Sequence, residues 1–446
     1  PILHFYEHFL KEYDSIMREQ RGVYYTPLPV VKFIVRSVDK ILQKEFGLED
    51  GLADTATWGD MLGKHPEITL PEHASESEPF VQILDPATGT GTFLVEVIDL
   101  IEKRMKGKWQ DQGKRDKEID TLWNAYVADH LLPRLNGFEL MMAPYAIAHI
   151  KIGMKLAESG YQPKDNTGSR VGVYLTNTLE EPTGLGEQSV MDFIPASLSA
   201  EARGADEVKA QTPITVVIGN PPYSRNSYNL ADAHKAWVHK YRTIEKKSIV
   251  DRGHLELERA IQNDYVKFLA YSLNSLTLSS AGLIGMITSN SFLHAHLLAG
   301  LRFDWLNNSN QISIIDLHGY AQGQANSAEG TLDENVFNIL EGVAIHFTRL
   351  NKTLNYKYKI DTQEFIGTRA DKYSWLLSYS FSSGKVRKAT PPRYFFQINE
   401  NDESESYQNW FPIERVFNFY RGAIVTGRDK FVTEFDANNL LNKIRV

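Results

Sequence analysis

The sequence contains no cysteine among its 446 residues, which excludes disulfide bonds, zinc ribbons and thiol nucleophiles. No apolar run approaches the roughly 18 residues of a membrane-spanning helix, and no charged and then apolar leader opens the chain. We therefore expect a cytoplasmic protein without membrane contact. An excess of positive charge is lacking too, since the formal net charge is −8, so any nucleic acid must be bound by a local basic surface.

The length is about three times that of an average domain, and 42% apolar and 23% charged residues are ordinary for a globular protein. We expect a helical segment at residues 1–50, a core domain at 51–350 and a further segment at 351–446, where Tyr, Phe, Lys and Asn are more frequent. Pro1 is not an initiator methionine, and residues 443–446 carry no obvious end signal. The chain is therefore expected to be a piece of a longer polypeptide.

Short apolar runs alternate with helical patterns over most of the chain. Seven runs have the length of buried strands, at residues 81–84, 135–138, 171–175, 215–218, 282–287, 312–315 and 343–347. Apolar residues at helical spacing occur at 2–19, 29–42, 92–105, 141–156 and 264–278. This alternation predicts an α/β fold, a Rossmann-like and mostly parallel seven-stranded sheet with helices on both faces. Residues 181–212, which contain several Gly, Glu and Ala, are predicted to form an inserted loop.

The first predicted strand runs into a glycine-containing turn and then a helix. The turn and its flanks read Asp85, Pro86, Ala87, Thr88, Gly89, Thr90, Gly91, Thr92 and Phe93. Glycines let the backbone turn sharply and lie against a ligand, and a helix N-terminus offers free N–H groups. A glycine pair alone is as often structural, but the full Asp-Pro-x-x-Gly-x-Gly-x-Phe pattern favours a cofactor-binding turn.

The second predicted strand ends at Gly137, Phe138 and Glu139. An acidic side chain at this end of the strand faces the same cleft and can accept both hydroxyls of a ribose. Taken alone, Glu139 reads as a solvated carboxylate. Its position in the series of strands favours the ribose interpretation.

The fourth predicted strand delivers Asn220, Pro221, Pro222 and Tyr223 to its carboxyl end, the edge where ligands bind in open α/β sheets. The two prolines restrict the backbone, so that the Asn220 side-chain oxygen and a nearby carbonyl can point at one amino group. The Tyr223 ring offers a flat face for stacking. Such a tetrapeptide after an apolar strand is rare by chance and indicates a functional loop.

With these motifs in this order, the chain resembles the amino-group DNA methyltransferases of the adenine-N6 class, in the γ arrangement of motifs. The resemblance is closest to the methyltransferase portion of large single-polypeptide restriction–modification enzymes. It extends from residues 5–7 and 21–27 to residues 426–429. It implies double-stranded DNA as the partner, and fusion to nuclease and translocase parts that lie outside this chain.

The resemblance further implies S-adenosylmethionine as the cofactor. Glu139 would bind its ribose, and Asn177, followed by Thr178, stands where the family usually has an acidic residue that reads the cofactor's adenine. The other residues expected around the cofactor, mostly at its methionine end, are Tyr25, Thr26, Pro27, Asp85, Pro86, Ala87, Thr88, Gly89, Gly91 and Phe93. No metal is implied.

In this class, Asn220 and the Pro221 carbonyl would bind the exocyclic amine, which attacks the sulfonium methyl in line without a general base. The base must be flipped out of the duplex, at a cost of a few kcal/mol, and stacking on an aromatic ring returns roughly 1–3 kcal/mol. Tyr223 and, by the resemblance, Phe337 would supply that stacking, although Phe337 is equally compatible with a core aromatic. The absence of cysteine agrees with methyl transfer to an amine, because methylation at cytosine C5 uses a cysteine nucleophile.

A basic stretch follows the Asn220 loop, and we expect Arg225, Lys235 and Lys240 within it to contact DNA phosphates. A solvated helix face explains the same charges equally well. Sequence recognition is expected after about residue 350. Two other interpretations remain open, a methyltransferase that acts on rRNA guanine or protein glutamine, and a DNA-recognition module without activity.

Overall fold

A computed structural model describes residues 25–163, 170–182, 196–223, 227, 229, 232–250, 253–319, 332–351 and 358–396. All of them belong to the first of two compact units, Pro1–Gln397. The helix expected at 2–19, the motif residues before Tyr25, the basic Arg225 and the motif at 426–429 lie outside the described residues.

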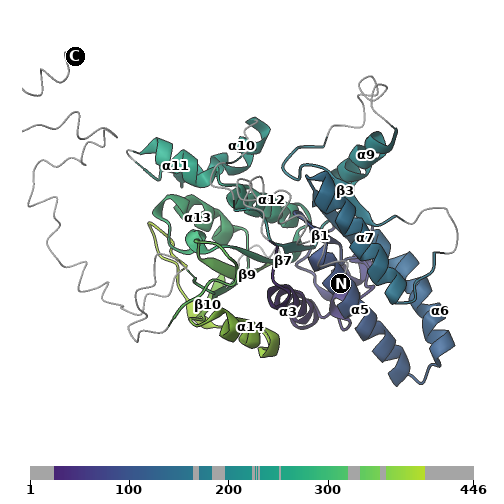
Figure 1. The fold of residues 1–446 in the computed structure, drawn as a ribbon. Helices are drawn as coiled ribbons and strands as arrows, with labels where there is room; N and C mark the ends of the chain where they lie inside the picture. Colours follow the sequence, from purple (N-terminus) through teal and green to yellow (C-terminus); the bar gives the residue numbers. More distant parts are fainter. Residues whose placement is uncertain are drawn as a thin grey trace, which may run out of the picture. The chain divides into compact units, whose positions relative to one another are not determined.

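The described helices and strands alternate along the chain (Figure 1). The helices are α3 (Leu28–Phe46), α4 (Trp58–Lys64), α5 (Thr92–Asp111), α6 (Asp116–Tyr126), α7 (Met142–Glu158), α9 (Ala196–Gln211), α10 (Asp232–His239), α11 (His254–Ile261), α12 (Asp264–Leu278), α13 (Ala299–Asn307) and α14 (Arg369–Ser378). The strands are β1 (Ile83–Asp85), β2 (Leu135–Glu139), β3 (Gly172–Leu175), β4 (Val216–Gly219), β5 (Thr243–Ile244), β6 (Lys247–Ser248), β7 (Ala281–Ser289), β8 (Gln311–Asp316), β9 (Val343–Asn351), β10 (Lys359–Glu364) and β11 (Lys385–Arg387).

Nine of these strands form one sheet in the order β11-β10-β8-β9-β7-β4-β1-β2-β3. The strands from β3 to β7 in that order are parallel to one another, with Ile83 opposite both Leu135 and Val216. β9 runs antiparallel between β7 and β8, and the short β5 and β6 form a separate hairpin. The predicted α/β class is therefore confirmed.

All seven predicted strands are present, but the sheet has nine strands rather than seven. β10 pairs in parallel with β8, and β11 pairs antiparallel with β10 at the edge. β10 reads Lys-Ile-Asp-Thr-Gln-Glu and has a single apolar side chain, Ile360, so it lacks the apolar run that marks the other strands. The sheet thus continues past residue 350, and the functional division of the chain at that residue stays a prediction.

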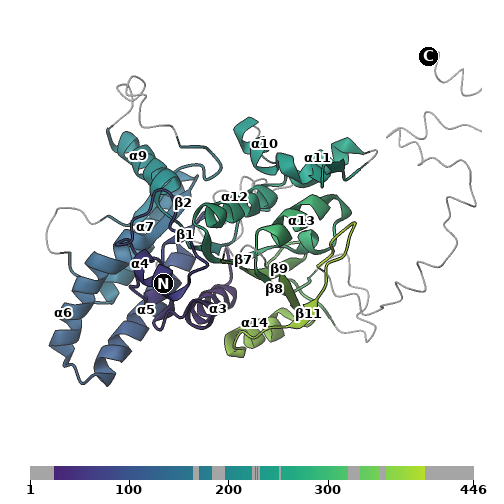
Figure 2. The same cartoon turned by 180° about the vertical axis from the view of Figure 1, so that it is seen from behind.

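Helices cover both faces of the sheet. α12 and α13 lie on one face, and α3 and α14 lie on the other, in both views (Figures 1 and 2). α3 also packs against α5, and α5 packs against α7, so these helices form one continuous layer. Among the helices that the structure describes, none is both long and apolar enough to cross a lipid bilayer.

The helix predicted from residue 29 is α3, and its sequence explains its bounds. Pro29 lies in its first turn, where no N–H is needed, and Gly47 ends it in the left-handed conformation, with φ 63°. Its apolar face packs on β7 so closely that a Cβ at Gly285 would lie 2.5 Å from Val38. The chain segment that precedes α3 is thereby held beside the centre of the sheet.

The loop predicted at 181–212 is wrong for its second half, where α9 spans Ala196–Gln211. Its Ala, Glu and Lys residues are strong helix formers. Gly204, which suggested a loop, is needed for packing, since a Cβ there would lie 2.2 Å from the ring of Tyr174. A glycine in this position therefore indicates a close contact and not a turn.

The buried His346, on the interior strand β9, predicts a pH dependence of stability. It is fully buried between Trp305 and Phe292, and neither ring nitrogen has a hydrogen-bond partner in the described part of the chain. Burial lowers the pKa of His346 to about 3, from its usual value near 6.5. Between these values the unfolded chain binds a proton that the folded chain does not, so stability falls as the pH falls.

We expect His346→Leu to remove this dependence. Between about pH 7 and pH 5, wild-type protein should lose about 2 kcal/mol more of its free energy of unfolding than the variant does. Urea unfolding at both pH values measures the difference, with substitution of the exposed His73 by Leu as a control. An identical pH dependence of wild type and His346→Leu would contradict the interpretation.

Candidate functional site

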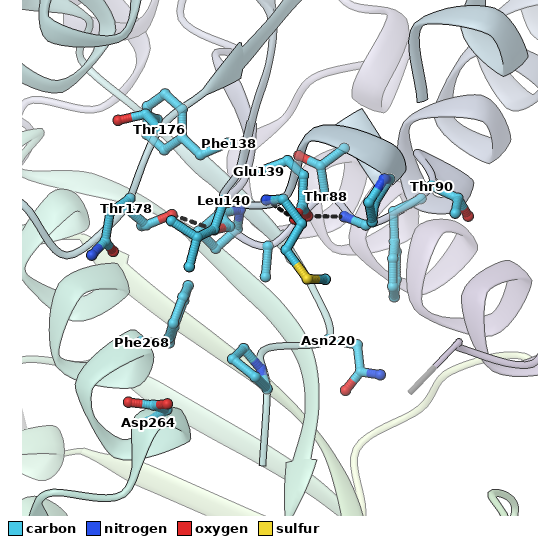
Figure 3. A pocket seen from close by; sticks show the side chains of 18 of the residues that line it. Thr88, Thr90, Phe138, Glu139, Leu140, Thr176, Thr178, Asn220, Asp264 and Phe268 are labelled. Carbon is cyan, nitrogen blue, oxygen red and sulfur yellow. Dashed lines mark hydrogen bonds between the residues drawn. The ribbon is translucent and has the colours of Figure 1, made fainter. Parts of the chain in front are cut away.

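A cavity of about 310 Å³ lies at the carboxyl ends of β1, β2, β3 and β4 (Figure 3). Its volume is in the range of small-molecule sites, and its place at this edge of the sheet is the usual one for ligands in open α/β folds. The predicted site residues on its wall are Tyr25, Thr26, Pro86, Ala87, Thr88, Gly89, Phe93, Glu139, Asn177, Thr178, Asn220 and Pro222. Residues from five separate parts of the sequence therefore meet in one space.

The glycine turn between β1 and α5 forms one wall of the cavity. Gly89 and Gly91 both have left-handed backbones, with φ 55° and 77°, and Gly91 is the N-cap of α5. A Cβ on Gly91 would lie 3.2 Å from Ala148 of α7, so this glycine also permits a close helix contact. Gly91 itself supports the turn from behind and does not line the cavity.

Glu139 fastens this turn to the end of β2. One carboxylate oxygen accepts the Gly89 N–H at 2.8 Å, and the other accepts the Met141 N–H at 2.7 Å. The Thr88 N–H donates to the Phe138 carbonyl at 2.9 Å, which adds a second tie between turn and strand. Glu139 lies on the cavity wall, where a carboxylate can accept hydroxyl groups from a ligand.

Asp85 lies beneath the turn and not on the cavity wall. One of its oxygens accepts the Ala87 N–H at 3.1 Å, and the other has no hydrogen-bond partner among the described residues. Burial, helped by the negative charge of Glu139, raises the pKa of Asp85 to about 8. A cation bound nearby would favour the ionised form, because an opposite charge stabilises a carboxylate.

The Asn220 amide is held at both ends. Its nitrogen donates to Thr26 Oγ1 at 3.0 Å, and its oxygen accepts the Tyr223 hydroxyl at 2.6 Å. Thr26 precedes α3, and Pro27 is the N-cap of that helix, so the contact joins the start of the described chain to the end of β4. The amide is thus oriented before any ligand arrives.

Tyr223 and Phe337 lie behind Asn220 and not on the cavity wall. Tyr223 is 6% exposed and Phe337 is 4% exposed, and their rings meet edge to face with centroids 6.3 Å apart. Burial raises the pKa of the Tyr223 hydroxyl well above its usual value, so this group remains a donor. Pro221, next to Asn220, does not line the cavity either.

The two described members of the expected phosphate-binding group have acidic partners. Lys235 lies 3.1 Å from Asp232, and Lys240 lies 2.9 Å from Asp304. Ion pairs at an exposed surface are weak, so both lysines can exchange these partners for a phosphate. Their contact with DNA stays a prediction.

The opposite wall of the cavity was missed from the sequence. Asp264 and Phe268 of α12 lie across from Thr88 and Glu139 (Figure 3). Asp264 accepts hydrogen bonds from Ser227 and Asn229 at 2.5 and 3.0 Å, and the fully buried Lys267 donates to the same two residues. In the sequence these side chains fall within an ordinary amphipathic helix, and no local signal separates a cavity wall from core packing.

His234 and Asn229 complete that wall. His234, on α10, is buried, and its Nδ1 has no hydrogen-bond partner in the described residues. Asn229 accepts a hydrogen bond from the Asn177 amide at 3.0 Å, which links the loop after Tyr223 to the end of β3. The segment that follows the Asn220 loop is therefore part of the same site.

Residues 192–322 match the model of the family described as Eco57I restriction-modification methylase. The matched segment contains the Asn220 loop, α12 and β7. No curated protein sequence matches the chain at a significant level.

Three solved structures share the fold over 99% of this chain. They are a DrdV–DNA complex (23% identity, TM-score 0.62), the ATP-dependent Type ISP restriction-modification enzyme LlaBIII bound to DNA (22%, 0.70), and a nuclease-deletion mutant of the Type ISP enzyme LlaGI with a DNA substrate mimic (22%, 0.64). The chain spans 39%, 28% and 32% of those chains, respectively. The match at residues 192–322 and this fold confirm the predicted resemblance to the methylase part of restriction–modification enzymes.

Proposed function

We propose that this chain transfers a methyl group from S-adenosylmethionine to the N6 amine of an adenine flipped out of double-stranded DNA. The observation that carries the proposal is that Asn220 and Pro222 line the same cavity as Gly89 and Glu139. A methyl donor held by the glycine turn would therefore lie within reach of an amine held by Asn220. The family match at residues 192–322 supports the same chemistry.

The residues around the cavity fit the proposed cofactor. Glu139 lies on the cavity wall, and a carboxylate there can accept ribose hydroxyls. Asp85, buried beneath the turn, would not contact the cofactor and would instead hold the turn in shape through the Ala87 N–H. Phe138, Leu140 and Phe268 supply apolar surface for a purine. S-adenosylmethionine would supply an electrophilic methyl group, and the protein would orient it without a metal or a covalent intermediate.

Asn220 would bind the target amine through its side-chain oxygen, together with the Pro221 carbonyl. The Tyr223 hydroxyl lies 2.6 Å from that oxygen and 3.2 Å from the Ile287 carbonyl, and both can accept from it. The amine would replace the bond to Asn220, while loss of the bond to Ile287 would cost about 1–3 kcal/mol. Tyr223 must then turn from its buried position to stack on the base. Two acceptors on one amine favour the pyramidal nitrogen that attacks the methyl group, and its proton leaves afterwards.

DNA is proposed as the substrate because LlaBIII and LlaGI, which share the fold, are DNA-bound restriction-modification enzymes. Lys235 and Lys240, together with Arg225, are proposed phosphate contacts. β10 and β11, which belong to the sheet, and α14, which packs on it, lie within residues 359–387. We therefore place sequence recognition in the part of the chain after Phe396. Nuclease and translocase parts would belong to a longer polypeptide.

Transfer of a labelled methyl group to DNA tests the proposal directly. The full chain is incubated with unmodified bacteriophage DNA and isotopically labelled S-adenosylmethionine, and the DNA is digested to nucleosides. We expect label in N6-methyladenine alone, at sites that sequencing maps to one motif. Parallel incubations contain ribosomal RNA or protein in place of DNA, and label in guanine or glutamine there, with none in DNA, would contradict the proposal. Tight cofactor binding without any transfer would indicate an inactive recognition module.

Asn220→Ala should lower the rate of methyl transfer by roughly 10²–10³-fold, because one oriented acceptor is lost. The dissociation constant for S-adenosylmethionine, measured by calorimetry, should change little. Tyr223→Ala should behave in the same way, while Tyr223→Phe keeps the stacking ring and should retain most of the rate. Loss of cofactor binding with normal turnover of the bound fraction would argue against this role.

Glu139→Ala should raise the dissociation constant for S-adenosylmethionine by roughly 10–100-fold, since two hydrogen bonds to a charged acceptor are lost. Glu139→Gln, which retains one acceptor oxygen, should give an intermediate value. Glu158→Ala is the control, because it removes an exposed carboxylate that lies outside the cavity. An unchanged dissociation constant for Glu139→Ala would contradict a contact between this residue and the ribose.

A further inference from the structure

The segment 333–337 leads to β9 and carries Phe337, yet it contains no helix or strand. Its backbone groups therefore lack the partners that regular structure supplies, and buried groups of this kind need others. The structure shows where those partners come from. Three side chains of one helix, α14, bind four consecutive carbonyls of this segment.

Arg369 and Tyr373 bind three of the carbonyls. Arg369 donates to the carbonyls of Asn335 and Phe337, at 2.7 and 3.0 Å. The Tyr373 hydroxyl donates to the carbonyl of Val336 at 2.7 Å. The flat guanidinium group can serve two carbonyls at once because its N–H groups have a fixed fork geometry.

Lys372 binds the fourth carbonyl from a fully buried position. Its ammonium donates to the carbonyls of Glu334 and Leu317 and to the Asp333 carboxylate, each at 2.6 Å. Leu317 directly follows β8, so Lys372 joins the segment to the sheet. Burial lowers the pKa of Lys372, and the Asp333 carboxylate opposes that shift. All three N–H groups of the ammonium have acceptors, as a buried charge requires.

The helix that carries these side chains has its own supports. A capping box between Thr368 and Asp371 fixes its first turn. At its other end, Arg36 of α3 donates to the carbonyls of Leu376 and Leu377. Positions 369, 372 and 373 fall on one face of the helix, so a single rigid surface meets the segment.

We propose that Arg369, Lys372 and Tyr373 are positioning residues for methyl transfer, because they fix the backbone that holds Phe337 against Tyr223. None of them lines the cavity. The proposal rests on the proposed function, since it assigns these residues a part in forming the base pocket. When Tyr223 turns out to meet the base, a fixed Phe337 keeps the other side of the pocket in place.

The test compares Arg369→Met with Arg36→Met in the full chain. Each variant loses two hydrogen bonds from an arginine to main-chain carbonyls, but only Arg369 contacts the segment 333–337. Hydrogen exchange of the peptides that cover residues 334–340 should rise at least about tenfold in Arg369→Met. It should rise by less than about twofold in Arg36→Met, because Arg36 binds only the last turn of α14, beyond the three side chains that hold the segment. Single-turnover methyl transfer to unmodified bacteriophage DNA should fall by about tenfold in Arg369→Met alone, with cofactor affinity retained.

Arg369→Lys should recover part of the rate, because one ammonium can bind one of the two carbonyls. If Arg369→Met does not fold, Tyr373→Phe removes only a hydroxyl and should lower the rate by a few fold. Unchanged exchange at residues 334–340 would overturn the proposal, and so would equal rate losses in Arg369→Met and Arg36→Met. If the wild type methylates no adenine, the proposed function fails, while the exchange measurement still decides whether α14 fixes the segment.

Discussion

The hydrogen bonds of the Asn220 amide are the constraint on which the site depends. One end binds Thr26 and the other binds Tyr223, so the lead into α3, the end of β4 and the aromatic pair meet at one side chain. In the proposed reaction, a substrate amine would replace the bond from Tyr223 to Asn220, and the Ile287 carbonyl would lose its bond from the same hydroxyl. Proposed base binding would also expose the Tyr223 ring, and stacking on a base, worth roughly 1–3 kcal/mol, would offset much of that cost.

Buried charges occur where the chain leaves regular structure. Lys267 holds the loop after Tyr223, and Lys372 holds the segment before β9, each with several oxygen acceptors. Removal of such a charge is costly because its acceptors lose their partner in a low-dielectric interior. Asp85 differs, since one of its oxygens lacks a partner in the described chain and its pKa is raised to about 8. Near neutral pH Asp85 is therefore largely protonated, and a cation bound nearby would favour its ionised form.

The sequence predicted the elements whose signals are local. Apolar runs located all seven predicted strands. The glycine turn, Glu139 and the Asn220 loop could be predicted to share one edge of the sheet because each directly follows a predicted strand. β10 was missed because its side chains are mostly polar, and Asp264 and Phe268 were missed because a cavity wall and a core have the same helical spacing. The contacts of α14 could not be predicted from the sequence, because its side chains bind main-chain carbonyls, and every residue has a carbonyl.

The direction of β9 explains why Phe337 lies near the site at all. Parallel strands end at the edge where the cavity lies, whereas an antiparallel strand begins there. Val343, the first residue of β9, pairs with Ser289, the last residue of β7. The segment that leads into β9 must therefore cross this edge, and Phe337 is only six residues before the strand. Position alone does not fix a segment without helix or strand, and here the side chains of α14 that bind its carbonyls hold the backbone that carries Phe337.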